Sequence, residues 1–313
     1  MHKKYFLLSL VLVASGCSKA DEKESPGGHQ EKLQYIVNQS LNNMVYVEGD
    51  TFIMGDFGLL GDDGVWRPYF PPTAEQDKAH EVTLSSYSLA SLPTTWEEYD
   101  TYRLDTAQPV VTFLYRNDPE EREPYIKIAD AYEYILKPAL VPWKEAKNYC
   151  LWLSKKTELR FDLPTSAQWE FAARNRGATE WLYPTHDGNP VADYAHPYYE
   201  IVNQRSKSPA GTRLPPNPLG IYDTAGNGEE WVSDWYSETY YGENPKVHNP
   251  QGPDIGDEKI MRALGTGSLA FSFSRRGTPD VISSPLGAEH DVNALAGFRC
   301  AVQSTTPVNK ARR

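Results

Sequence analysis

The stretch LPPNPLGIYDTAGNGEEWVSDW, from Leu214 to Trp235, decides the fold of this chain. Its three prolines fix φ and exclude a helix, so we expect an extended segment as far as Gly220. A tight turn is expected next, because permissive glycines and short polar side chains follow in close succession. We expect the rest of the chain to be organised around this turn.

Two acids flank the predicted turn. Asp223 and Glu230 are separated by a short segment that contains Gly226 and Gly228. Carboxylates and free backbone carbonyls are the hard oxygen ligands that Ca²⁺ takes, so these four residues form a candidate structural calcium site. The alternative is a tight glycine turn whose acids only face water.

The segment from Pro215 to Trp231 resembles the signature of the formylglycine-generating enzyme (sulfatase-modifying factor) family. Three further matches follow the family's order: Met44–Gly55 resembles its opening strands, Leu163–Arg174 its central helix and Gly297–Cys300 its last strand. Together they cover residues 41–303. The resemblance implies an α+β fold of the formylglycine-generating-enzyme-like (C-type-lectin-like) type, rich in loops, with short antiparallel strands and a few helices.

The first 17 residues, MHKKYFLLSLVLVASGC, have the pattern of a secretory signal: two lysines, a short apolar run and small residues before Cys17. The run is too short to span a bilayer as a helix. We expect a bacterial lipoprotein signal over residues 1–17, with Cys17 lipidated, and an ordinary signal peptide is the alternative. Ser18 suggests the outer membrane, facing the periplasm. Residues 18–40 are charged and rich in Gly and Pro at their start, as in a flexible tether.

The chain is acidic, with a formal net charge of −11. Removal of residues 1–17 takes away two lysines and leaves 29 basic against 42 acidic residues, a net charge of −13. This balance argues against nucleic acid or an anionic membrane surface as a partner, and it suits a cation or a basic protein. Residues 41–303 are long enough for one domain with a large core, or for two closely packed lobes, followed by a tail over residues 304–313.

Cys150 and Cys300 are the only cysteines after Cys17. An even pair in an oxidising compartment is most simply a disulfide, and two buried free thiols are the alternative. Family members carry a bridge between matching positions, so the resemblance also implies the disulfide. By the same resemblance, a second calcium site involving Asp193 and Asn203 is left open.

Local patterns indicate several further elements. Thr95 with Glu98, and Thr165 with Gln168, have the spacing of capping boxes that begin helices. Hydrophobic periodicity and β-branched or aromatic content predict the other elements. These are strands within residues 44–55 and 80–89, and helices over residues 125–137 and 143–157.

The family's generating enzyme oxidises a substrate cysteine with O₂ and uses two cysteines that hold copper. The resemblance places those cysteines between residues 267 and 297, and this interval contains no cysteine. Cu(I) requires soft ligands such as thiolates, and Glu229 stands where the family keeps an aromatic residue. We therefore expect no formylglycine generation. The histidines lack the i, i+3 or i, i+4 pairing of a metal site, and hydrolase motifs are absent.

These observations predict a non-catalytic, periplasm-facing lipoprotein that binds and blocks, or scaffolds, another envelope protein. The resemblance implies, more specifically, an immunity protein against a type VI secretion effector such as a lipase. One alternative is a metal-dependent oxidase of the nonheme-iron type, and another is a structural subunit of an envelope secretion machine. Candidate binding regions are the charged insertion over residues 104–141 and residues 252–296.

Overall fold

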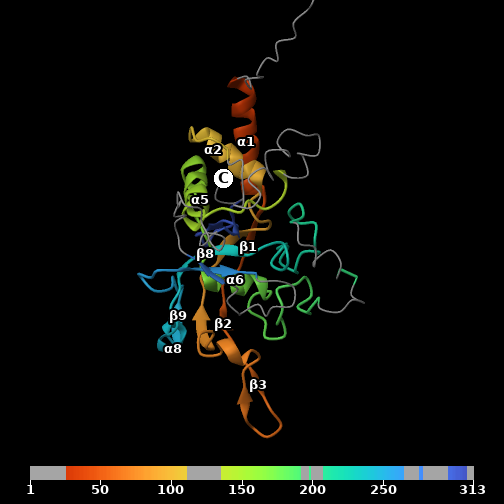
Figure 1. Cartoon of the computed structure of the whole chain (residues 1–313), viewed down its shortest axis with the longest axis vertical. Helices are drawn as coiled ribbons and strands as arrows, with labels where there is room; N and C mark the ends of the chain where they lie inside the picture. The colour runs from red at the N-terminus through yellow and green to blue at the C-terminus, as the bar shows by residue number, and fades with distance from the viewer. Residues whose placement is uncertain are drawn as a thin grey trace, which may run out of the picture.

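The computed structural model describes residues 26–110, 135–191, 197–198, 207–263, 275–277 and 295–308, with backbone alone at 275–277. The chain is elongated, with helices at one end, sheets in the middle and a hairpin at the other end (Figure 1). The signal with Cys17, most of the 104–141 insertion and its expected helix, and both Asp193 and Asn203 lie outside the described residues.

Helices are few, and most of them are short. The helical elements of the described residues are α1 (Pro26–Asn42), α2 (Trp96–Asp105), α5 (Trp143–Thr157), α6 (Ser166–Ala173), α8 (Tyr240–Glu243) and a 3₁₀ turn over Pro71–Thr73. In this part of the chain, no helix combines the length and the apolar character needed to cross a bilayer.

The strands of the described residues form four small sheets. The first has the order β1 (Met44–Val47), β6 (Tyr87–Ala90), β13 (Ala301–Val302), β7 (Phe161–Asp162). The second has the order β11 (Arg275–Gly277), β10 (Lys259–Arg262), β8 (Glu230–Trp235), β12 (Gly297–Phe298). The third has the order β2 (Thr51–Met54), β5 (His80–Thr83), β9 (Lys246–His248), and the fourth pairs β3 (Leu59–Leu60) with β4 (Trp66–Arg67). The mixed α and β architecture with short, mostly antiparallel strands is the one predicted.

Both predicted strand regions are divided between two sheets. Residues 44–55 become β1 and β2, and residues 80–89 become β5 and β6. The break lies at Gly49, where an added Cβ would stand 2.2 Å from the carbonyl oxygen of Leu84. Two chain segments therefore cross in close backbone contact, which only glycine permits. At the crossing, the first segment passes from the first sheet to the third, and the second segment passes from the third sheet to the first.

Helix α1 corrects the prediction of a flexible tether over residues 18–40. From Pro26 onward the chain is helical, and Leu33, Ile36, Val37 and Leu41 are buried in the same core cluster as residues of α2 and α5. These four positions recur at helical spacing on one face, a signal that the charged, Gly-containing start of the segment obscured. The apolar stripe outweighs the poor helix propensity of that start, because burial against α2 and α5 stabilises the helix.

The other helices follow their local signals. Thr95 and Thr165 are N-caps with both hydrogen bonds of the capping box formed, to Glu98 and Gln168 respectively. In α5, Cys150 lies on the buried face and forms the expected disulfide with Cys300, with 5.7 Å between the Cα atoms. The disulfide fastens the helical layer to the segment between β12 and β13, at the centre of the fold.

Candidate functional site

The central turn begins at Asn217, whereas the prolines around it predict an extended segment as far as Gly220. The Asn217 side chain accepts hydrogen bonds from the backbone N–H groups of Leu219 and Ile221, and its amide nitrogen donates to the Ala172 carbonyl at 2.8 Å. Gly220 follows with φ +88°, a left-handed conformation that favours glycine. The turn is thereby fastened to the end of α6, and the chain leaves it towards Asp223.

Glu230, an expected calcium ligand, is the counter-ion of Arg299. The fully buried Arg299 guanidinium donates from Nε to Oε2 at 2.7 Å and from Nη2 to Oε1 at 2.5 Å. Trp169 Nε1 also donates to Oε2, at 3.0 Å. The remaining guanidinium hydrogen bonds go to the backbone carbonyls of Ala90, Ser91 and Tyr222. One arginine thus joins the last strand, the central turn and β6.

Asp223 occupies a separate set of contacts. It adopts a positive φ of 55°. Its Oδ2 accepts hydrogen bonds from the Gly211 N–H at 2.7 Å and from Asn227 Nδ2 at 3.0 Å. Its Oδ1 is buried and has no hydrogen-bond partner. Burial raises the pKa of this carboxyl group above its ordinary value. The side chain braces the turn from within the protein.

Protein cations stand next to the other expected calcium ligands. The Gly226 carbonyl accepts a hydrogen bond from Arg213 Nη1. A Cβ added at Gly228 would lie 3.3 Å from Lys207 Nζ, so that ammonium group is adjacent to the backbone there. With Glu230 held by an arginine as well, two of the four expected ligands already bind a protein cation, and Gly228 lies beside a third. Within the described ranges, no group of three or more His, Cys, Asp or Glu side chains is placed to hold a metal ion.

A Ca²⁺ ion at this turn would have to displace these cationic side chains, so the donor set does not fit the expected site. The physical reason is that Glu230 and the Gly226 carbonyl find positive partners in Arg299 and Arg213, and that Lys207 lies beside Gly228. The spacing of Asp223, Gly226, Gly228 and Glu230 could not show these partners. Chelation tests directly whether calcium binds at this turn.

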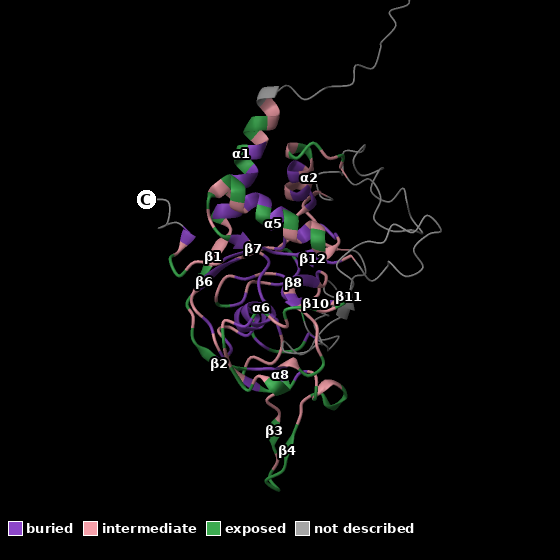
Figure 2. Ribbon diagram, turned by 90° about the vertical axis from the view of Figure 1, so that its left-hand side faces the viewer, coloured by how far each residue is buried: buried purple, intermediate pink, exposed green. Residues whose placement is uncertain are grey.

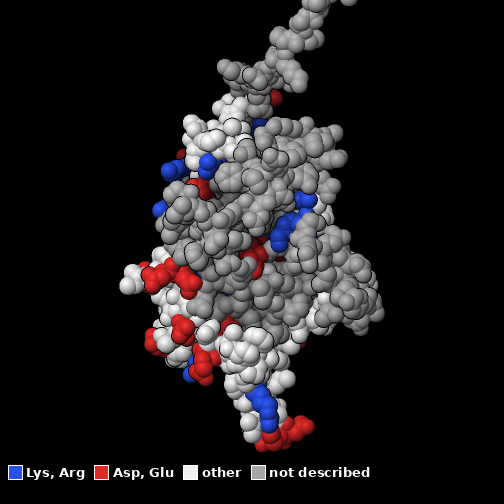
Figure 3. Space-filling view, in the orientation of Figure 1, with Lys and Arg blue, Asp and Glu red and all other residues white. Residues whose placement is uncertain are grey.

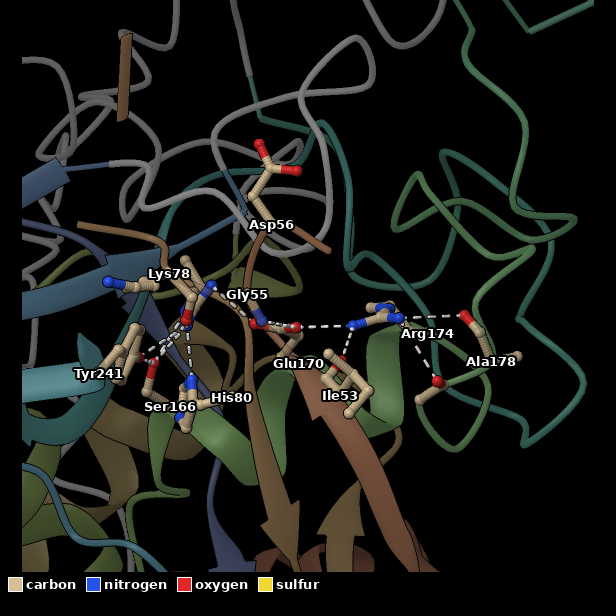
Figure 4. A network of polar contacts seen from close by, with 12 residues as sticks. Ile53, Gly55, Asp56, Lys78, His80, Ser166, Glu170, Arg174, Ala178 and Tyr241 are labelled. Carbon is tan, nitrogen blue, oxygen red and sulfur yellow. Dashed lines mark hydrogen bonds and ion pairs between the residues drawn. The ribbon is translucent and has the colours of Figure 1, made fainter. Parts of the chain in front are cut away.

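A second buried ionic network connects the opening strands to the central helix (Figure 4). Glu170 Oε1 accepts hydrogen bonds from the Gly55 N–H at 3.0 Å and from Arg174 Nη1 at 2.8 Å. The same Arg174 nitrogen donates to the Ile53 carbonyl at 2.8 Å. Arg262 Nη1 approaches the other Glu170 oxygen at 3.4 Å, and all three charged side chains are fully buried.

The groups of this network that titrate near neutral pH are also enclosed. Asp234 Oδ2 accepts from the Ser166 N–H at 2.7 Å, and burial raises the pKa of this carboxyl group to about 6. The His80 ring stacks on Tyr241 at 4.4 Å between centroids, and burial lowers its pKa. Shifted pKa values often mark acid–base catalysts. Asp234 and His80 are both buried, so the packing of the scaffold accounts for these shifts.

Only some of these residues carry a signal in the sequence. Glu170 and Arg174 stand at i and i+4 on one helix, which is a readable signal. Arg262 and Lys259 have no local signal, because their partners are distant in sequence. Lys259 is buried with Nζ 4.1 and 3.6 Å from the ring centroids of Trp143 and Trp235, and burial lowers its pKa to about 8.

The interval that would carry the family's copper-binding cysteines lies largely outside the described residues. Its sequence contains no cysteine, and both cysteines after residue 17 are joined to each other in the disulfide. Cys150 and Cys300 are also buried in the core. The central turn and the two ionic networks thus hold the four sequence motifs together as a scaffold.

Comparison with known proteins identifies this scaffold. The chain belongs to the sulfatase-modifying factor enzyme 1-like domain family, whose profile matches residues 30–304. It is 28% identical over 283 residues to the serine/threonine-protein kinase pkn1 of Chlamydia caviae, covering 87% of this chain and 40% of that one. It is 32% identical over 177 residues to the formylglycine-generating enzyme of Streptomyces coelicolor, covering 51% of each.

Among solved structures, PvdO from Pseudomonas aeruginosa has the same fold. The TM-score is 0.59 at 22% sequence identity, over 83% of this chain and 93% of that one. The alignments to the two curated relatives span about half of each relative's length or less. The predicted family and fold class are therefore confirmed.

Proposed function

We propose that this chain is a non-catalytic member of its family, a protein-binding module that blocks or scaffolds another protein of the bacterial envelope. The observation that carries the proposal is the use of its cysteines. The two that follow residue 17 form one buried disulfide, and none stands between residues 267 and 297. Copper chemistry of the family's kind needs free thiolates, and this domain has none to offer.

The sequence and its charge support the location and the kind of partner. The lipoprotein-type signal ending at Cys17 suits an outer-membrane protein that faces the periplasm. The net charge of −11 suits a basic partner. In its most specific form the proposal is an immunity protein against a type VI secretion effector such as a lipase, which would be blocked by occlusion of its active-site mouth. That form rests on the family resemblance together with the charge.

The catalytic part of the proposal is tested by direct assay. The purified chain is supplied with copper, O₂ and a peptide carrying a sulfatase-type cysteine motif, and mass spectrometry measures conversion to formylglycine. The Streptomyces coelicolor enzyme serves as the positive control. We expect no conversion and no stoichiometric copper or iron after washing with chelator. Turnover, or one tightly held transition-metal ion per chain, would overturn the non-catalytic proposal.

The binding part is tested in cells. Deletion of the gene should sensitise the cells to kin that carry an active type VI secretion system, and expression of the full chain should restore resistance. A Cys17→Ser variant is the matched control, because it removes only the lipid anchor; it should be absent from the outer-membrane fraction and should protect less well. Unchanged resistance after deletion would contradict an immunity role, although a stoichiometric complex with another envelope protein would still support the broader binding function.

A further inference from the structure

Residues 57–70, which contain β3 and β4, form an arm on the surface of the protein. The two buried ionic networks do not account for this arm. Figures 1 and 2 show this arm projecting from the body at the end opposite to the start of α1. In the described part of the chain, eleven large apolar side chains are exposed, and five of them lie on the arm. These are Leu59, Leu60, Val65, Trp66 and Phe70.

Single exposed apolar residues are normal on a protein surface, whereas a group of them marks an interaction site. Leu60 is 72% exposed and Trp66 is 50% exposed, and they are register partners across the hairpin. Tryptophan is enriched among the residues that contribute most to binding at protein interfaces. The arm thus presents an aliphatic and an aromatic side chain together to the solvent.

The arm is fastened to the body at its base. The carboxylate of Asp56, which is 1% exposed, accepts hydrogen bonds from the backbone N–H groups of Gly58 at 3.0 Å and of Tyr69 and Phe70 at 2.9 Å each. The N–H of Asp56 itself donates to the Asp77 carbonyl at 2.6 Å. One buried carboxylate therefore holds both limbs of the hairpin.

Further contacts fix the arm along its length. Trp66 Nε1 donates to the Phe57 carbonyl at 2.7 Å, which holds the exposed indole in place. Near the tip, Asp63 pairs with Arg67 at 2.6 Å and also accepts a hydrogen bond from the Val65 N–H. A surface that is already ordered loses less conformational entropy on binding than a mobile loop does.

The charge of the tip limits what the arm can bind. Asp62 and Asp63 are exposed at the tip, with Arg67 behind them, and Figure 3 shows this acidic end beyond the rest of the arm. Acidic side chains are repelled by an anionic lipid surface, and two copies of the tip would repel each other. A protein surface with basic residues around an apolar recess is complementary to both the charge and the apolar side chains.

We propose that the arm of residues 57–70 inserts Leu60 and Trp66 into an apolar cleft of the partner protein, with the exposed Asp62 facing lysine or arginine residues at the rim of that cleft. This inference rests on the proposed binding function and assigns the surface that carries it out. It differs from the binding regions suggested by the sequence, residues 104–141 and 252–296.

The test uses the full chain in its own envelope. A photo-activated cross-linking residue replaces Leu60, and in a second strain it replaces Ile255, which is 85% exposed on another loop. We expect a discrete protein adduct from position 60, with the cross-linked peptide of the partner mapping to an apolar cleft bordered by basic residues. The captured protein is then purified and titrated with the unmodified chain at low and high salt.

Leu60→Ser is the decisive variant, because the Leu60 side chain makes no hydrogen bond and its loss leaves the arm intact. It should weaken the affinity about 30-fold, whereas Leu151→Ser, at an exposed position on α5, should leave the affinity unchanged. Equal binding of the wild type and Leu60→Ser would overturn the role of the arm and leave the proposed function standing. Adducts only with lipid, or only between copies of the chain, would also overturn it. No adduct from either position would contradict the proposed function as well.

Discussion

The pair formed by Arg299 and Glu230 offers the sharpest test of the scaffold. Arg299→Met removes a fully buried guanidinium and leaves the Glu230 carboxylate with the Trp169 N–H as its remaining hydrogen bond in this set. It also removes the donors to three backbone carbonyls. Breaking a buried ion pair on one side costs about 3–5 kcal/mol, so we expect a loss of about 4 kcal/mol in the free energy of unfolding.

The measurement is urea unfolding of the oxidised protein at neutral pH, followed by tryptophan fluorescence. The double variant Glu230→Gln with Arg299→Met tests the coupling, because glutamine still accepts the hydrogen bond from Trp169 without leaving an unpaired buried charge. It should cost at least about 1.5 kcal/mol less than the sum of the two single variants.

Arg67→Met is the matched control, since the Arg67–Asp63 pair has a similar distance of 2.6 Å but side chains that are 57% and 53% exposed. Its urea midpoint should equal that of the wild type. A loss below about 1 kcal/mol in Arg299→Met, or strict additivity in the double variant, would refute the role given to this pair.

Three further predictions concern the disulfide, the buried carboxyl group and calcium. Replacing both Cys150 and Cys300 by alanine should lower the free energy of unfolding by up to about 5 kcal/mol, because the bridge closes a loop with a sequence separation of 150; an unchanged urea midpoint would show that the bridge contributes nothing. The Asp234 pKa is raised by burial from 3.8 to about 6, so its stabilising contribution is complete below pH 4 and is lost as the pH rises through 6. Asp234→Asn should therefore become more stable relative to the wild type between pH 4 and 7, by on the order of 2 kcal/mol, and a constant difference across this range would contradict the assignment. Finally, the thermal midpoint should be the same in Ca²⁺ and in EGTA, because arginine and lysine side chains stand at the expected ligands; a lower midpoint in EGTA would show that calcium displaces them.

Much of the fold could be predicted from short windows of sequence. The capping boxes at Thr95 and Thr165 begin helices where their spacing predicts, and Cys150 lies on the buried face of its helix. The family's motifs fixed the overall architecture. These signals are legible because a helix cap or a hydrophobic stripe depends on residues within one or two turns of each other.

The prediction was weaker where two signals competed in one segment. The apolar stripe of α1 is masked in the sequence by the charged, Gly-containing residues before it, which are typical of a linker. The two predicted strand regions each divide between sheets at the crossing near Gly49. Periodicity shows that a segment is extended, but it does not show which neighbour the segment pairs with.

The sequence by itself determined the family, the central turn, the disulfide partners and the lack of thiols where the family places its copper ligands. Only the tertiary structure decided that Glu230 pairs with Arg299, that Glu170 meets Arg262, and that Asp56 holds the arm of residues 57–70 away from the body. The physical reason is that the partner of a buried charge is chosen by which segments the fold brings together. The two partners are dozens of residues apart in the sequence, so no local spacing predicts that they pair.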